Sequence, residues 1–171
     1  MTLRLLQVMA GAESGGAETA FIDMVLALHE RGVRQHVVTR TNDRLRRLDA
    51  AGVPYTCLPF GGAVDLYTPY QMRKILRTFR PEAVQTWMSR AAAKTPAWES
   101  RMGIPRYLKI CRLGGYYKLK YYRGADYFIA ITPDIKRYLV GQGVPETRVF
   151  HINNFADVEE APTPITRAQM G

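Results

Sequence analysis

The sequence predicts an α/β domain built on a doubly wound parallel sheet. Short apolar stretches recur along the chain and are typical of strands buried in a parallel sheet. Amphipathic stretches with helical spacing follow most of them, and glycine or proline ends many of these segments. Because strand and helix alternate throughout, and 171 residues suit one core, we expect a single domain.

The elements can be assigned in chain order. The expected strands are residues 3–9, 35–39, 55–58, 83–87, 106–112, 127–131 and 148–152. The expected helices are residues 17–31, 42–52, 68–80, 89–102 and 132–139. Pro96 predicts a kink or a break in the fourth helix, since proline cannot continue the hydrogen-bond ladder. Ligands of such sheets bind at the carboxyl ends of the strands, where the strand order reverses.

A turn with two adjacent glycines, Gly15 and Gly16, joins the first strand to the first helix. A backbone without Cβ atoms can approach a ligand closely, and a helix N-terminus favours anions, phosphate above all. Glu13 replaces the middle glycine of the dinucleotide fingerprint, while Ala17 and Glu18 replace the Lys and Ser/Thr of a P-loop. The alternative is a tight turn without a ligand. The other strand ends expected at the same edge favour a binding site.

Charge and cysteine content limit the classes of partner. The net charge is +9, with more arginine than lysine, so nucleic acid, an anionic membrane and phosphorylated small molecules are all candidates. Cys57 and Cys111 are expected to be buried, reduced thiols of a cytoplasmic protein. The scattered histidines predict no metal site, and we expect neither a signal sequence nor a membrane span.

The segment Arg101–Arg123 combines cations with tyrosines and contains no Asp or Glu. Its cations are Arg101, Arg106, Lys109, Arg112, Lys118, Lys120 and Arg123, and its tyrosines are Tyr107, Tyr116, Tyr117, Tyr121 and Tyr122. Tyrosine beside Lys or Arg suits a membrane interface with anionic headgroups. No RNA-binding or recognition-helix signature accompanies the segment, so we rank a membrane above nucleic acid. A solvated loop is the alternative.

Several motifs, taken in order, resemble those of family 4 glycosyltransferases of the GT-B fold. They are Val8–Met9 with Gly15–Glu18, Trp87–Ala91, Tyr127–Ile131 with Thr132–Asp134, and Val149–Asp157. The resemblance covers nearly the whole chain. It implies that residues 1–158 form a Rossmann-like, acceptor-binding N-terminal domain and that residues 159–171 are a linker towards a C-terminal donor-binding domain. This chain alone is then expected to be an inactive fragment.

The resemblance also implies an activity. It points to a retaining transferase that needs no metal or other cofactor and moves a sugar from a nucleotide-diphospho-sugar to a lipid-linked or polysaccharide acceptor. Members that act on lipids often bind anionic membranes through this domain, which implies a cytoplasmic protein, peripheral at the inner face of the membrane. The alternative is a non-catalytic Rossmann-like module that binds an anionic membrane surface or a phospho-ligand.

Site residues follow from the same resemblance. Gly15 and Gly16 match the loop that lies against the donor diphosphate. We expect Arg90 and Arg112 to position an anionic acceptor or steady the leaving diphosphate. The acceptor side includes Tyr116 and Tyr117. Many members carry a histidine at the end of the strand that matches residues 106–112, and none stands here. Either Arg112 or a backbone group there takes its place, or the acceptor geometry differs. Arg112 is therefore a candidate catalytic residue, and the assignment stays open.

Overall fold

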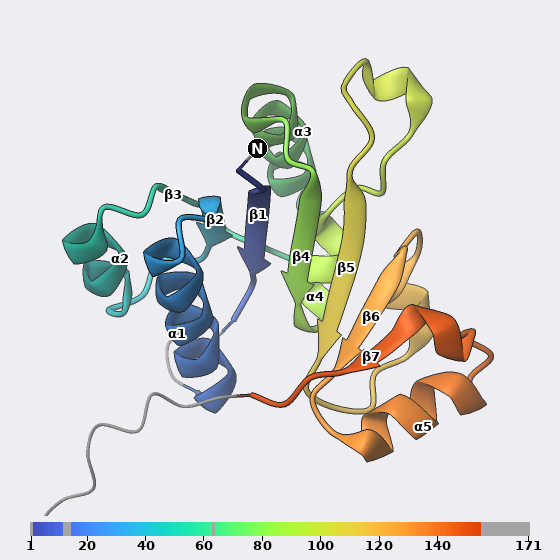
Figure 1. Ribbon diagram of the computed structural model, residues 1–171. Helices are drawn as coiled ribbons and strands as arrows, with labels where there is room; N and C mark the ends of the chain where they lie inside the picture. Colours follow the sequence, from blue (N-terminus) through green and yellow to red (C-terminus); the bar gives the residue numbers. More distant parts are fainter. Residues whose placement is uncertain (1, 12–14, 63, 155–171) are drawn as a thin grey trace, which may run out of the picture.

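Seven parallel strands form one sheet in the computed structural model, which describes residues 2–11, 15–62 and 64–154 (Figure 1). The strands are β1 (Arg4–Met9), β2 (Arg34–Thr39), β3 (Tyr55–Cys57), β4 (Ala83–Trp87), β5 (Leu108–Leu113), β6 (Tyr127–Ala130) and β7 (Val149–His151). Their order is β3-β2-β1-β4-β5-β6-β7, so the winding direction reverses between β1 and β4. All seven strands predicted from the sequence are confirmed, as is the doubly wound parallel fold.

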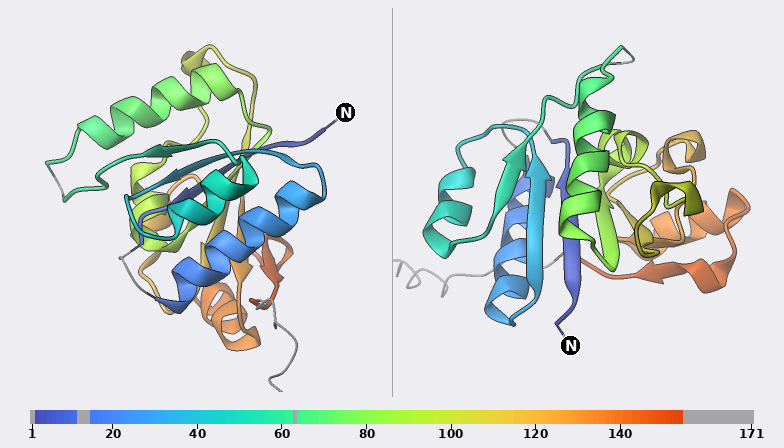
Figure 2. Two further views of the ribbon diagram at one scale, coloured as in Figure 1. Left: turned by 90° about the vertical axis from the view of Figure 1, so that its left-hand side faces the viewer. Right: turned by 90° about the horizontal axis from the view of Figure 1, so that it is seen from above.

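Helices cover the sheet on both sides (Figure 2). On one side lie α1 (Gly16–Glu30) and α2 (Leu45–Ala51), which share a core with Trp87. On the other side lie α3 (Tyr67–Phe79), α4 (Met88–Lys94) and α5 (Pro133–Gly141). Three short 3₁₀ turns complete the described elements: η1 (Ser100–Met102), η2 (Leu119–Tyr122) and η3 (Glu146–Arg148).

The predicted break at Pro96 is confirmed, whereas the predicted burial of the cysteines is correct for only one of them. The predicted helix 89–102 is broken before Pro96, as the proline suggested: α4 ends at Lys94 and only the turn η1 follows. The prediction that both cysteines are buried is wrong for Cys57, which is exposed because it ends the edge strand β3. Cys111, in the interior strand β5, is buried as predicted and accepts a hydrogen bond from the Thr86 hydroxyl at 3.3 Å.

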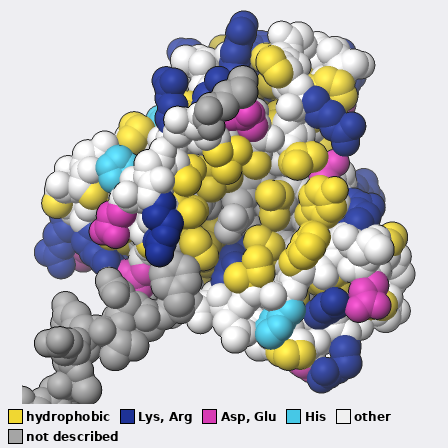
Figure 3. All heavy atoms as spheres, viewed as in Figure 1, with side chains coloured by type: hydrophobic (Ala, Val, Ile, Leu, Met, Phe, Trp, Pro, Cys, Tyr) yellow, Lys and Arg dark blue, Asp and Glu magenta, His cyan; other side chains and the backbone are white. Residues whose placement is uncertain are grey.

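The side of the sheet that carries α1 is covered over β1–β3 but not over β5–β7 by any described helix (Figure 1). The register places Trp87, Arg112, Ile129 and Phe150 in one row across β4–β7, so these side chains share the face that packs against α1. Phe150 is 51% exposed, and its ring contacts that of Tyr127 at 5.9 Å. Figure 3 shows hydrophobic side chains gathered in the middle of this view. Parallel sheets are normally covered on both faces, so this apolar face is suited to a packing partner.

The loop between β3 and α3 is cross-linked by polar contacts. The Asp65 carboxylate accepts hydrogen bonds from the backbone N–H of Gly61 (2.8 Å) and of Thr68 (2.9 Å). From α4, Lys94 Nζ donates to the carbonyl groups of Gly62 and Asp65, both at 2.8 Å. These contacts hold Gly61, Gly62, Asp65 and Thr68 to one another and to α4.

These contacts make stability sensitive to acid. Hydrogen bonds from Thr68 hold the pKa of Asp65 at about 2, below its ordinary value of 3.8. A carboxylate with a depressed folded-state pKa stabilises the fold above its unfolded pKa, and this contribution is lost as the pH falls towards the folded one. We expect the melting temperature to fall more steeply between about pH 4 and pH 2 than in Asp65→Asn, measured by circular dichroism. Parallel curves for the two proteins would contradict this role of Asp65.

Candidate functional site

Two hollows lie where β1, β4 and β5 end, at the point where the strand order reverses. Their volumes are about 210 Å³ and about 260 Å³. Trp87, Met88 and Tyr117 line both, so the two hollows are neighbours. Arg112 and Asn154 line only the first hollow, which is the smaller of the two. The edge of the sheet predicted to bind a ligand is thus the edge that carries these hollows.

The two glycines of the turn are both exposed but have different neighbours. Gly15 precedes α1, and Gly16 begins it. The buried Glu18 folds back against Gly11 and Gly15, and a Cβ on either glycine would overlap its carboxyl group. A Cβ on Gly16 would meet nothing within 4 Å. A side chain at Gly15 would therefore displace the end of the Glu18 side chain, whereas the exposed backbone of Gly16 can be approached from outside. Glu13, used in the sequence argument, lies outside the described residues.

Met88 bends the chain at the shared wall of the two hollows. Its φ is 65°, in the left-handed region that non-glycine residues rarely adopt. Such strain costs roughly 1–3 kcal/mol and tends to occur at functional sites. The bend lets α4 begin directly after β4, with Ser89 and Arg90 lining the second hollow. Nothing in the sequence marks a methionine for this conformation, so the sequence could not have predicted it.

Arg112 lies inside the protein and ties three segments together. Its side chain is buried, and its guanidinium lies over the Trp87 ring at 4.8 Å. Nη2 donates to the carbonyl groups of Ile152 (3.3 Å) and Asn153 (3.1 Å) and to Asn154 Oδ1 (2.8 Å). Burial lowers the pKa of Arg112 from its ordinary value. All three of these hydrogen bonds are directed to the segment that follows β7.

Trp87 links this arginine to the rest of the site. Its Nε1 donates to Gln7 Oε1 at 3.2 Å, and its ring meets the edge of Phe21 from α1 at 5.3 Å. Arg112 Nε is buried and has no hydrogen-bond partner among the described residues. The first hollow therefore has an aromatic wall, formed by Trp87, that is fixed by contacts with Gln7, Phe21 and Arg112.

The two tyrosines predicted to shape the acceptor side have different positions. Tyr117 lines both hollows, as the prediction requires. Tyr116 is 62% exposed and lines neither; its hydroxyl donates to Asp134, and its ring packs edge-on against Tyr138 at 5.3 Å. The hydrogen bond to Asp134 raises the pKa of Tyr116.

Arg90 lies at the second hollow together with a cation that the sequence analysis did not single out. Arg40, directly after β2, lines the same hollow. Both arginines are exposed, and neither forms an ion pair within the part of the chain that the structure describes. The signal that could have revealed Arg40 is its place at the carboxyl end of a predicted strand.

The surface expected from the segment Arg101–Arg123 is smaller than the sequence predicted. Lys109 and Arg112 are buried, and Arg101 and Arg106 form ion pairs with Glu99 and Asp126. The exposed cations of the segment that form no ion pair among the described residues are Lys118, Lys120 and Arg123. Sequence composition could not show this, because it does not reveal which strand residues point into the core.

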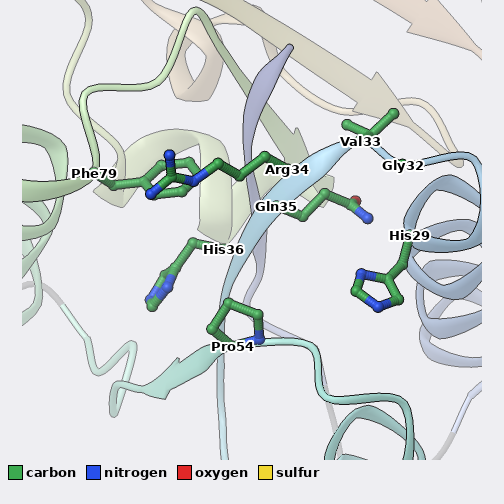
Figure 4. A pocket seen from close by; sticks show the side chains of 8 residues that line it. All are labelled: His29, Gly32, Val33, Arg34, Gln35, His36, Pro54 and Phe79. Carbon is green, nitrogen blue, oxygen red and sulfur yellow. The ribbon is translucent and has the colours of Figure 1, made fainter. Parts of the chain in front are cut away.

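A larger hollow of about 450 Å³ lies at the opposite edge of the sheet, at the start of β2 (Figure 4). In this view His29 and His36 lie on opposite sides of β2. His36 shares a 2.9 Å hydrogen bond with the Thr56 hydroxyl, and burial lowers its pKa. Its lining includes the polar residues His29, Arg34, Gln35 and His36, but it lies at the amino edge of the sheet, away from the carboxyl ends of the strands where ligands of such folds bind, so its size alone does not make it a site. Among the described residues, no three His, Cys, Asp or Glu side chains are grouped to hold a metal ion.

Comparison with known proteins decides the family. The model of Glycosyltransferase Family 4 matches residues 14–160. The chain belongs to this family. It is 30% identical over 171 residues to the lipopolysaccharide core biosynthesis glycosyltransferase LpsD of Rhizobium meliloti, a match that covers 98% of this chain and 47% of LpsD. The resemblance inferred from the motifs is confirmed.

Solved structures show the same fold. A glycosyltransferase from Rickettsia africae aligns with a TM-score of 0.68 at 14% identity, over 89% of this chain and 43% of that one. HepE from Anabaena, solved in complex with UDP and glucose, aligns with a TM-score of 0.64 at 17% identity, over 91% of this chain and 45% of HepE. The family 4 chain described here thus spans about half the length of these proteins.

Proposed function

We propose that this family 4 chain is the acceptor-binding half of a retaining glycosyltransferase that uses a nucleotide-diphospho-sugar and a lipid-linked or polysaccharide acceptor. The observation that carries the proposal is the pair of hollows joined by Trp87, Met88 and Tyr117 at the edge where the strand order reverses. The name of LpsD supports a saccharide on a lipid, and the UDP and glucose bound to HepE support the donor class.

Each residue receives a role from its position. The exposed Gly16 backbone at the start of α1 meets the donor phosphates, where the helix dipole favours negative charge. Arg90 and Arg40 meet an anionic group of the acceptor in the second hollow. Tyr117 separates the two ligands. Arg112 becomes a positioning residue, because its Nη2 is held by residues 152–154. In this proposal the dipole of α1 favours the diphosphate charge, and no metal takes part.

We also propose the domain arrangement that the resemblance implied. Residues 1–158 form one domain, and residues 159–171 link it to a donor-binding domain. The apolar outer face of β5–β7 supports this arrangement, because it suits packing against further polypeptide. We place the protein in the cytoplasm, peripheral to the inner face of the membrane. No helix of the described part is long and apolar enough to cross a bilayer.

The test compares the 171-residue chain with the polypeptide encoded by the complete reading frame. We expect transfer of sugar only from the longer polypeptide, with the anomeric configuration of the donor retained in the product, as read by nuclear magnetic resonance. Turnover by the 171-residue chain would refute the half-enzyme proposal. A longer polypeptide that binds UDP-sugars without transfer to any saccharide acceptor would favour the non-catalytic module instead.

Gly16→Ala tests the donor role of the turn. The added Cβ meets no protein atom, so we expect the free energy of unfolding to stay within about 0.5 kcal/mol of the original. Donor affinity of the longer polypeptide should fall roughly tenfold, since the methyl group blocks close approach of the diphosphate. Gly15→Ala is the matched control: it displaces Glu18 and should lower stability by about 1–3 kcal/mol. Unchanged UDP binding by Gly16→Ala, measured by calorimetry, would remove Gly16 from the donor site.

A further inference from the structure

The hollow of about 450 Å³ at the start of β2 borders an open edge of the sheet. Pairing between β2 and β3 begins where Val37 lies opposite Tyr55, so residues 34–36 of β2 extend beyond β3. On its other side β2 is paired with β1 from Arg34 onwards. One edge of β2 therefore has no described strand beside it at residues 34–36, although β2 lies inside the sheet.

Pro54 interrupts the hydrogen bonds between β2 and β3. The Val37 N–H donates to the Pro54 carbonyl at 2.9 Å, so residue 54 still faces β2. The next bond of a parallel ladder would run from the nitrogen of residue 54 to the Gln35 carbonyl, but proline has no N–H to donate. No described backbone group takes its place. The Gln35 carbonyl thus lacks its ladder partner.

The backbone N–H of Gln35 faces the same way as its carbonyl. Successive residues of a strand direct their backbone groups to opposite neighbours, and Arg34 donates to the Leu3 carbonyl on the side of β1 at 3.1 Å. Gln35 therefore presents an N–H and a C=O to the hollow that it lines. Only 3% of Gln35 is exposed, and buried backbone groups are nearly always paired. These two groups suit a ligand that offers one acceptor and one donor.

The Gln35 backbone is held in place by its own side chain. Nε2 of Gln35 donates to the Val25 carbonyl of α1 at 2.8 Å, and Oε1 accepts a hydrogen bond from Gln7 Nε2 at 3.3 Å. Both hydrogen bonds are buried. They fix Gln35 to α1 and β1, so its backbone N–H and C=O stay directed at the hollow.

The hollow is basic. Arg34 and His36 lie on one face of β2, since side chains alternate along a strand, and Figure 4 shows both on the side of Phe79. The ring centroids of Phe79 and His36 are 5.7 Å apart. Arg34 is exposed and forms no ion pair among residues 2–11, 15–62 and 64–154. No Asp or Glu is among the described residues that line the hollow, so its charge favours an anion.

A free peptide carboxyl terminus offers the matching set of groups. Its last residue carries an N–H and a carboxylate that can point the same way, towards the C=O and the N–H of Gln35. The carboxylate then lies where Arg34 can approach it, and a charge-assisted hydrogen bond is stronger than a neutral one. A carboxylate without the amide would leave the Gln35 carbonyl unpaired, and an internal stretch of peptide would leave Arg34 without an anion. A carboxyl terminus satisfies both residues.

We propose that the open edge of β2 binds the carboxyl terminus of a partner polypeptide, which adds a short extended segment beside Gln35. The terminal carboxylate accepts from the Gln35 N–H and pairs with Arg34, while the last N–H of the peptide donates to the Gln35 carbonyl. The last side chains of the peptide pack on Pro54 and Phe79. A volume of about 450 Å³ lies within the range of ligand pockets and fits the last few residues of a chain.

This surface lies away from the candidate site. β2 spans six residues, so its start and Arg40, just beyond its end, are about 20 Å apart. Arg40 lines the second hollow at the carboxyl edge of the sheet. A polypeptide bound at the amino edge therefore leaves both hollows open, and the inference does not depend on the proposed function.

The test uses N-acetyl-alanyl-threonyl-valine with a free carboxyl group and the same tripeptide as its carboxyl amide. Saturation-transfer nuclear magnetic resonance with the longer polypeptide measures the binding of each, without any turnover. We expect the free acid to bind roughly tenfold more tightly than the amide, because only the acid gives Arg34 an anion. No binding of the acid, or equal binding of the two, would overturn the proposal.

A pair of arginine variants locates the peptide. Arg34→Gln should weaken binding of the free acid roughly tenfold, because it removes the charge that meets the carboxylate, and should leave binding of the amide unchanged. Arg31→Gln is the matched control: it removes the same charge from an exposed neighbour that does not line the hollow, and it should alter binding by less than about twofold. Equal effects of the two variants would place the peptide elsewhere and overturn the inference.

Pro54→Ala tests the backbone pairing. Alanine supplies the missing N–H to the Gln35 carbonyl and so closes part of the edge, which should weaken binding of the free acid roughly tenfold. Circular dichroism shows whether the variant is folded, and undiminished binding by the folded variant would overturn the added segment. Displacement of the tripeptide by an equal concentration of sodium acetate would reveal a general anion site and overturn the need for a peptide.

Discussion

Lys109→Met is expected to lower the free energy of unfolding by about 2–4 kcal/mol, a large effect for a substitution in a segment that looks like an exposed basic patch. The Lys109 side chain is buried, and its Nζ donates to the carbonyl groups of Ala92 (2.9 Å), Thr95 (2.7 Å) and Arg123 (3.2 Å). Methionine fills the space but donates nothing, so three carbonyl groups lose their partner inside the protein. That loss outweighs the relief of removing a buried charge, because the carbonyl groups stay in place.

The same lysine predicts a pH dependence. Burial lowers the pKa of Lys109 from its ordinary value of 10.5. Between the folded and the unfolded pKa, the unfolded chain binds more protons at this position, so the contribution of Lys109 to stability rises with pH in that window. We expect the free energy of unfolding, measured with urea at increasing alkaline pH, to include a rise across this window. The same measurement on Lys109→Met should lack this rise.

Lys118→Met is the control for both measurements. Lys118 is exposed, and its replacement should change stability by no more than about 0.5 kcal/mol. If Lys109→Met were as stable as Lys118→Met, the three carbonyl contacts would not be what holds the end of α4 and the turn before β6 against β5.

The sequence predicted the sheet well because its signals are local. Apolar stretches, helix-stopping glycines and Pro96 each act within a few residues, and all seven strands and the broken fourth helix follow from them. The edge of the sheet that carries the site was also predictable, since the carboxyl ends of parallel strands meet there. Arg90 and Tyr117 were placed at that edge correctly.

What the sequence could not supply depends on contacts between distant residues. Arg112 is 40 residues from Ile152, one of the groups that it binds, and no pattern near Arg112 announces that contact. Tyr116 and Tyr117 are neighbours, and only the fold decides that the second one reaches the hollows. Cys57 looked buried because its stretch is apolar, but the strand that contains it lies at the sheet edge.

Arg112→Met is expected to release residues 152–154 and to lower the free energy of unfolding by about 3 kcal/mol, because it breaks a buried charge-assisted contact and its stacking on Trp87. The amide of Ile152, which donates to the Ala130 carbonyl at 3.0 Å, should then exchange its hydrogen at least tenfold faster. Hydrogen exchange read by nuclear magnetic resonance measures this directly. Arg112→Lys keeps the charge but cannot reach three acceptors in one plane, so it should restore the protection only in part.

Arg148→Met separates positioning from general destabilisation. Arg148 also donates to backbone carbonyl groups, those of Ala125 and Asp126, but it does not line either hollow. We expect a comparable loss of stability in this variant, with the Ile152 amide still protected and UDP affinity of the longer polypeptide unchanged. Arg112→Met should instead weaken UDP binding, because Trp87 and the segment after β7 both form walls of the first hollow. Equal weakening of UDP binding in the two variants would mean that Arg112 acts only through stability. Weakening in Arg112→Met alone would mean that Arg112, which the sequence suggested as an acceptor ligand, instead holds the walls of the site in place.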